Sequence, residues 1–153
     1  RYWLMKSEPE AYGIDDLARD KVTAWWGVRN YQARNFMRDQ MQLGDRGLFY
    51  HSNCAEPGIV GIVEVVKRAY PDATQFDRKH KYFDPKSSPD NPRWLNVDVK
   101  FVKKTPLVSL AELRSHKALA NMRTLAKGNR LSITPVDPAE WKFITERLMG
   151  DKA

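Results

Sequence analysis

The chain has 153 residues, 42% hydrophobic and 29% charged, so we expect one globular domain over residues 1–153 with a core large enough to need no disulfides. Its one cysteine excludes an intramolecular disulfide framework, and no apolar run approaches the ~18 residues of a membrane span. We therefore expect a cytoplasmic protein without a membrane partner. Because the first residue is Arg1 and not Met, we expect the natural chain to begin a residue or two earlier.

The net charge of +7 is unevenly distributed. Residues 1–76 hold ten basic and ten acidic side chains, so the whole excess lies in residues 77–153. A local basic surface of this kind favours a polyanionic partner, most often nucleic acid. A solvated basic surface without such a partner is an equally good explanation of the charge alone.

The first half of the chain predicts a strand, a short helix and a capped helix. Residues 2–7 are apolar on both faces, which is typical of a buried strand. A short helix is expected over 14–20. Asn30 is suited to cap a following helix, whose apolar side chains recur at helical spacing, and Gly44 and Asp45 then favour a turn.

The middle of the chain predicts strands. Residues 48–52 and 58–66 are expected to form a hairpin, with Gly61 at a possible bulge. Residues 95–101 alternate apolar and polar side chains, which predicts one buried and one solvent-facing side.

Three further elements are expected in the last third. Ser109 and Glu112 form a capping box that opens a short helix, and a helical run spans about 117–127, with Gly128 as its stop. Residues 130–136 suggest a last strand. Asp137 then caps a C-terminal helix.

Strands and helices do not alternate as βαβ units, which argues against a parallel doubly wound sheet. The pattern predicts an α+β fold, with a mixed, mostly antiparallel sheet closed or curled as a small barrel and helices packed around it.

The segment 71–93 has four prolines and no periodicity, which makes it either functional or loose. Arg78, Lys79 and Lys81 stand beside Tyr82 and Phe83, a mixture of cations and aromatic rings found in single-strand binders. The alternative is a solvated basic loop anchored to the core by its aromatic side chains.

The search for catalytic or metal-binding motifs is largely negative. His51 and Cys54 are three residues apart on a strand, which places them on opposite faces. The three histidines lie far apart in the sequence without ligand spacing, and no glycine-rich phosphate loop is present. We expect no metal, no cofactor and no catalytic residue.

Aromatic, amide and hydroxyl side chains are concentrated in three short runs, residues 25–31, 50–53 and 82–84. Core packing explains part of this set. The functional interpretation is a cage, in which flat rings and a few fixed hydrogen-bonding groups hold an extruded nucleobase and bind its polar edge.

These runs resemble the EVE domain family. The matching segments are Tyr2–Pro9, Trp25–Asn35, Phe49–Asn53, Gly58–Gly61, Tyr82–Ser87 and Arg130–Val136. The resemblance covers nearly the whole chain. It implies a PUA-like pseudo-barrel with peripheral helices and a non-enzymatic binding module that holds a flipped modified base, such as a modified cytosine, in an aromatic pocket.

The resemblance also implies a set of site residues. The candidates for the base pocket are Lys6, Ser7, Trp25, Trp26, Asn30, His51, Ser52, Asn53, Tyr82, Ser132 and Pro135. The candidates for phosphate binding are Arg29, Arg34, Arg78, Lys79, Lys81 and Arg130, although Arg29 and Arg34 are equally well explained as structural. Relatives usually carry an acidic residue where this chain has Trp26, so the rim of the pocket differs here.

Two other functions stay open at this stage. One is a small-molecule enzyme or sensor that uses the same pocket with His51 as acid or base. The other is an RNA-binding accessory protein in translation or tRNA metabolism. The sequence does not distinguish DNA from RNA as the partner and leaves the oligomeric state open, with a monomer expected.

Overall fold

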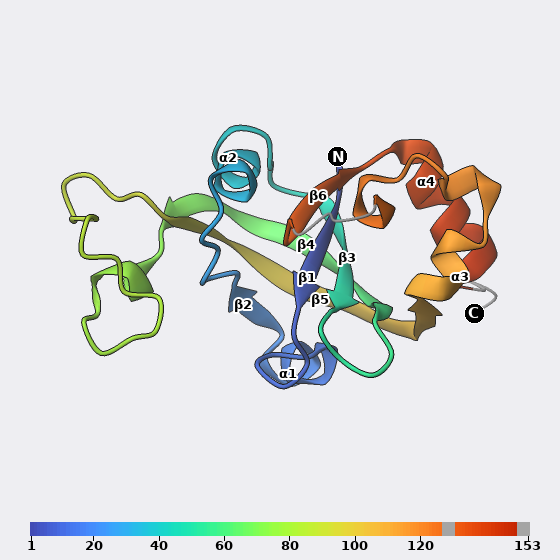
Figure 1. The fold of residues 1–153 in the computed structure, drawn as a ribbon, viewed down its shortest axis with the longest axis horizontal. Helices are drawn as coiled ribbons and strands as arrows, with labels where there is room; N and C mark the ends of the chain where they lie inside the picture. Colours follow the sequence, from blue (N-terminus) through green and yellow to red (C-terminus); the bar gives the residue numbers. More distant parts are fainter. Residues whose placement is uncertain (127–130, 150–153) are drawn as a thin grey trace.

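The computed structural model describes residues 1–126 and 131–149. A six-stranded sheet with the order β2-β5-β4-β3-β1-β6 forms its centre, with helices on both sides (Figure 1). The strands are β1 (Tyr2–Ser7), β2 (Val22–Ala24), β3 (Arg46–His51), β4 (Gly58–Pro71), β5 (Leu95–Ser109) and β6 (Ile133–Val136). The helices are α1 (Ile14–Asp20), α2 (Tyr31–Asp39), α3 (Leu110–Arg114) and α4 (Pro138–Phe143).

The sheet is mixed and mostly antiparallel. β1 pairs in parallel with β3, while the other neighbouring strands pair antiparallel. Between β4 and β5 the register shifts at several points, and such irregularities bend and twist a strand pair. The α+β fold with a mixed, mostly antiparallel sheet that the sequence predicts is thereby confirmed.

Both faces of the sheet are buried, because successive side chains of a strand point to opposite faces. In β1, Trp3 and Met5 belong to one core cluster, and Leu4 belongs to the other. Side chains of α1 and α2 complete the first cluster. Leu113 of α3 and Ile144 complete the second. The buried first strand is therefore confirmed, and its last two residues are half-buried.

The predicted helix caps are also confirmed. The Asn30 side chain accepts a hydrogen bond from the Ala33 backbone N–H, and the Ser109 hydroxyl accepts one from Glu112. Asp137 and Glu140 form the capping box of α4. Beyond α4 the chain continues as a π-helical turn, Ile144–Leu148.

The bulge expected at Gly61 is present one residue earlier. Phe49 pairs with Gly61 and Tyr50 with Ile59, so Val60 is the extra residue in β4. A Cβ atom on Gly61 would collide with Ile14 of α1, which explains why this position favours glycine.

The helix predicted over 117–127 is wrong. Two 3-10 turns, Lys117–Leu119 and Arg123–Leu125, take its place, and extended backbone at Met122 separates them. This break lets both Leu119 and Met122 enter the second core. Gly128 and the start of the strand predicted over 130–136 lie outside the described residues.

Two further features of the structure differ from what the sequence led us to expect. The strand β2 was not predicted, because three residues carry too little periodicity to be recognised. Asn96, expected on the solvent-facing side of its strand, is buried, because β4 runs on to Pro71 and pairs with β5 there. No helix among the described residues is both long and apolar enough to cross a membrane.

Candidate functional site

Asp72 joins two loops that are far apart in the sequence. Its carboxylate is fully buried and accepts hydrogen bonds from the Gly27 backbone N–H at 2.8 Å and from the Arg29 guanidinium at 3.1 Å. It also accepts from the backbone and hydroxyl of Thr74. Burial opposes ionisation, but these donors outweigh it and lower the pKa of Asp72. The carboxylate therefore holds the segment 25–30 against the segment after β4.

Arg29 strengthens this connection. Its Nε and Nη2 donate to the Tyr82 carbonyl, Nη1 donates to Val28 and Asp72, and Nη2 also donates to Thr74. These bonds account for all five N–H donors of a guanidinium. Because no donor remains for a phosphate, the geometry favours the structural alternative for Arg29.

The irregular segment 71–93 is organised around Gln75. The Gln75 amide is buried, donates to the carbonyls of Asp72 and Trp94, and accepts from Ser87 and from the backbone of Arg93 and Trp94. The segment also contains the 3-10 turn Ala73–Phe76. The Gln75 side chain therefore ties the start of this segment to its end.

A pocket of about 350 Å³ lies where these loops meet the end of β1. It is lined by Lys6, Ser7, Glu8, Ala11, Tyr12, Thr23, Ala24, Trp25, Trp26, Gly27, Val28, Arg29, Ser52, Lys81, Tyr82 and Ser132. Several segments that are distant in the sequence therefore contribute to one concave surface.

The pocket contains polar side chains without partners. The half-buried Lys6 ammonium lies 5.8 Å from the centre of the Tyr50 ring but makes no hydrogen bond or ion pair with any other residue that the structure describes, and burial lowers its pKa. The hydroxyls of Ser52 and Ser132 are likewise unpaired within 1–126 and 131–149. Glu8 accepts one bond from Asn53, at 3.3 Å, and forms no ion pair with Lys6.

The aromatic side chains of the pocket differ in exposure. Trp25 is only 7% exposed and packs edge-to-face on Phe49 in the first core. Tyr82 is half-buried, stacked on His80 and contacted by Arg29 and Lys81. Trp26 is 46% exposed. Gly27, with a φ of +83°, lies so close to the Tyr82 ring that a Cβ atom there would come within 2.7 Å of it.

The structure brings together most of the pocket residues suggested by the sequence. Lys6, Ser7, Trp25, Trp26, Ser52, Tyr82 and Ser132 line this pocket, together with Arg29 and Lys81 from the phosphate set. Of the remaining candidates, Asn30 is committed to the cap of α2. The His51 Nε2 accepts the Ile14 backbone N–H at 3.1 Å and so caps α1, and burial lowers the pKa of His51.

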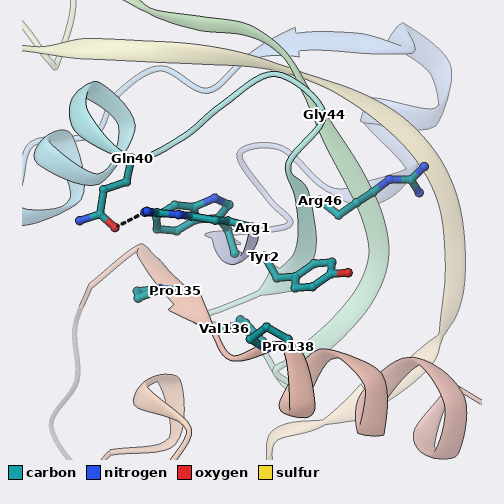
Figure 2. Close-up of a pocket in the computed structure, with 9 residues that line it drawn as sticks. Arg1, Tyr2, Gln40, Gly44, Arg46, Pro135, Val136 and Pro138 are labelled. Carbon is teal, nitrogen blue, oxygen red and sulfur yellow. Dashed lines mark hydrogen bonds between the residues drawn. The ribbon is translucent and has the colours of Figure 1, made fainter.

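Asn53 and Pro135 also lie outside the pocket wall. Asn53 adopts a φ of +51° in the turn after β3 and donates to Glu8. Pro135 lines a second pocket, of about 530 Å³, whose wall includes Arg1, Tyr2, Gln40 and Arg46 (Figure 2).

The remaining cations are dispersed. Arg78 and Lys79 are exposed on the segment 71–93, and the Lys81 ammonium lies 5.0 Å from the centre of the Tyr82 ring. Arg34 donates to the Arg93 carbonyl and to Asn35, which favours its structural interpretation. Arg130 lies outside the described residues.

Sequence reasoning missed Glu8, Tyr12 and Thr23 as pocket residues. Glu8 belongs to the matching run Tyr2–Pro9 and could have been identified there. Tyr12 and Thr23 carry no local signal, because the loop before α1 and the short β2 place them. Among the described residues, no group of three or more His, Cys, Asp or Glu side chains could hold a metal ion.

Comparison with known proteins decides the family. The model of the EVE domain matches residues 1–147. The chain belongs to the EVE domain family. It is 48% identical to human thymocyte nuclear protein 1, over 94% of this chain and 72% of that protein.

Solved EVE domain structures agree. A protein from Pseudomonas syringae superimposes with a TM-score of 0.92 at 44% identity, covering 95% of this chain and 98% of that one. Human THYN1 protein, in a crystal structure with DNA containing 5-methylcytosine, superimposes with a TM-score of 0.89 at 47% identity, covering 95% of each chain. An ASCH protein from Zymomonas mobilis shares only the fold, with a TM-score of 0.53 at 11% identity.

Proposed function

We propose that this EVE domain is a non-enzymatic nucleic-acid-binding module that holds a modified base, a modified cytosine in the first place, in the pocket between Lys6 and Tyr82. The observation that carries the proposal is the set of polar groups without hydrogen-bond partners that line this pocket together with Trp25. A half-buried ammonium that donates no hydrogen bond to another described residue is costly in free energy, and a ligand that accepts hydrogen bonds from Lys6 compensates for that cost.

The polar groups suit the edge of a cytosine. Cytosine offers an exocyclic amino donor beside a ring-nitrogen acceptor and a carbonyl acceptor, and carboxylates are the usual acceptors for that amino group. Glu8 supplies a carboxylate, and Lys6 with the hydroxyls of Ser52 and Ser132 supplies donors. The volume of about 350 Å³ falls within the range of small-molecule pockets.

A relative supports the same ligand class. Human THYN1 protein has been crystallised with DNA containing 5-methylcytosine, and it matches this chain over 95% of its length. Arg78, Lys79 and Lys81 stand on the same segment as Tyr82, and we propose that they contact the sugar-phosphate backbone. Binding through them weakens as salt concentration rises.

The enzymatic alternative loses the acid or base that the sequence suggested for it. His51, its candidate, uses Nε2 to accept the Ile14 backbone N–H and does not line the pocket. Turnover of a small molecule would therefore require another group.

The experiment is a panel of short DNA and RNA oligonucleotides that differ in one central base, either modified or unmodified. We expect a modified cytosine to bind more tightly than cytosine. We also expect Glu8→Gln to reduce the preference for cytosine-type over thymine-type bases, because an amide can donate as well as accept. Shape-dependent RNA binding that ignores base modification, or no oligonucleotide binding at all, would contradict the proposal.

A further inference from the structure

Trp26 is the aromatic residue of the pocket rim that remains open to solvent. Trp25 is buried against Phe49, and the Tyr82 ring is contacted by His80, Arg29 and Lys81. Trp26 leaves 46% of its surface exposed. It is therefore the most exposed of the four aromatic side chains that line the pocket.

The orientation of Trp26 is fixed by its neighbours. Its ring stands nearly perpendicular to His80, at 87° and 5.5 Å between centres, and at 69° and 5.8 Å to Tyr82. Edge-to-face contacts of this kind stabilise one ring orientation. His80 and Tyr82 belong to the segment that Asp72 and Gln75 organise. The indole of Trp26 therefore packs against two rings of an ordered segment and still leaves 46% of the residue exposed.

From this arrangement we infer that Trp26 stacks on the nucleotide next to the one held in the pocket. The inference rests on the proposed function for the base in the pocket. It adds that the ligand is recognised as two adjacent nucleotides, one caged and one stacked on the rim. Such stacking is tolerant of sequence, because every base presents a flat face. Lys81, on the same rim, is positioned to contact a nearby phosphate.

The alternative is that Trp26 forms part of the cage and touches the central base. Both alternatives predict weaker binding by Trp26→Ala. To distinguish them, the oligonucleotide must be varied as well as the protein. The oligonucleotide needed for this has abasic nucleotides on both sides of the central one. It keeps the backbone and the central base but lacks the bases on which Trp26 would stack.

The test compares wild-type protein and Trp26→Ala on two pentanucleotides with the same central 5-methylcytosine, one with normal flanking nucleotides and one with abasic flanks. On normal flanks we expect Trp26→Ala to weaken binding about 5- to 150-fold. On abasic flanks we expect less than about 2-fold, and wild-type protein should itself lose a similar factor when the flanking bases are removed. An abasic site on one side at a time shows which neighbour stacks.

Matched variants control for folding and for plain hydrophobic contact. Trp26→Phe keeps a flat ring and should retain most of the affinity, whereas Trp26→Leu keeps apolar area without a ring and should behave like Trp26→Ala. Tyr31 is 50% exposed, stacked on Trp94 and outside the pocket wall, so Tyr31→Ala should not change binding.

Equal loss on normal and abasic flanks would overturn the inference, and so would no loss on either, or no oligonucleotide binding by wild-type protein. Failure of the modified-base proposal has a different signature. In that case wild-type protein binds cytosine and 5-methylcytosine oligonucleotides equally, while the dependence of the Trp26 effect on flanking bases persists.

Discussion

The two pockets of this EVE domain differ in how their polar side chains are used. The larger one, of about 530 Å³, is bordered by Arg1, whose guanidinium donates to Gln40 at 2.9 Å (Figure 2). Arg46 pairs with Glu64, and Tyr2 stacks on Trp141. The smaller pocket, of about 350 Å³, contains Lys6, which lies over the Tyr50 ring but makes no hydrogen bond or ion pair with another described residue.

The two pockets therefore differ in the hydrogen-bonding groups that they leave free for a ligand. In the larger pocket, each of these side chains already has a partner within the protein. In the smaller pocket, Lys6 and the hydroxyls of Ser52 and Ser132 make no hydrogen bond with another described residue, while Asp72 and Arg29 fix the neighbouring loops. Preorganised groups of this kind increase affinity because little ordering is left to occur on binding.

The largest effect should come from removing the carboxylate that holds the smaller pocket together. Asp72→Asn leaves the Arg29 guanidinium, 19% exposed, without its anionic partner. We expect a loss of about 3–5 kcal/mol in the free energy of unfolding, measured in urea, together with weaker oligonucleotide binding.

Asp45→Asn is the matched control. Asp45 is also buried, and it accepts from the Trp3 indole at 2.9 Å on the side of the larger pocket. It should cost stability without weakening binding of the remaining folded protein. Equal binding losses in both variants would show that destabilisation alone is responsible.

The next largest effect is expected from removing one positive charge, and it should differ between the two pockets. Lys6→Met removes the ammonium but keeps an apolar stem of similar length, and we expect oligonucleotide binding to weaken about 10- to 100-fold. Its stability should stay equal or rise slightly, because burial penalises the charged form of Lys6. Arg46→Met, in the wall of the larger pocket, should change binding less than about 2-fold. The reverse pattern of losses would place the ligand in the larger pocket.

A smaller effect comes from two glycines with the same backbone strain. Gly27 and Gly44 have φ values of +83° and +87°, so alanine at either position should cost about 1–2 kcal/mol in unfolding free energy. Only Gly27→Ala collides with the Tyr82 ring, since nothing lies within 4 Å of a Cβ at Gly44. Titration with an oligonucleotide should therefore detect weaker binding for Gly27→Ala alone, and similar binding by both variants would remove Tyr82 from the site.

The smallest effect concerns His51, which lines neither pocket and should affect stability more than binding. Burial lowers its pKa from 6.5, so the unfolded chain takes up this proton at higher pH than the folded protein. The stability due to neutral His51 is fully present above pH 6.5 and is lost as pH falls through the lower, folded-state pKa.

His51→Gln should flatten this dependence, because a glutamine carbonyl can accept the Ile14 N–H without titrating. Urea unfolding on either side of about pH 6.5 measures the change. If the stability of the variant keeps the same pH dependence, that dependence comes from other titrating groups and not from His51. Oligonucleotide binding should change less than about 2-fold.

Local signals were readable from the sequence, whereas contacts across the fold were not. The Asn30 cap was predicted correctly, and the same side chain was also suggested for the pocket, but its one carbonyl oxygen is already engaged by Ala33. His51 and Asn53 follow Tyr50 in a matching run, yet only Ser52 of these three lines the pocket. The strand end, the turn and α1 decide which side chain points inward.

The segment 71–93 illustrates the same limit. Its prolines predicted irregular backbone, but its order comes from the buried Asp72 and Gln75, which bind groups from distant positions. A polar side chain that is buried because of long-range contacts carries no periodic signal. Family resemblance suggested Tyr82 and Lys6, and the fold adds Glu8, Tyr12 and Thr23.

The most direct test uses the indole N–H signals of the five tryptophans in a two-dimensional NMR titration with a 5-methylcytosine oligonucleotide. Trp25 and Trp26 line the smaller pocket, while Trp3 lines the larger one and Trp141 stacks on Tyr2 beside it. We predict that the Trp25 and Trp26 signals shift as ligand is added and that those of Trp3 and Trp141 stay in place. Shifts confined to Trp3 and Trp141 would contradict the proposal that the smaller pocket binds the modified base.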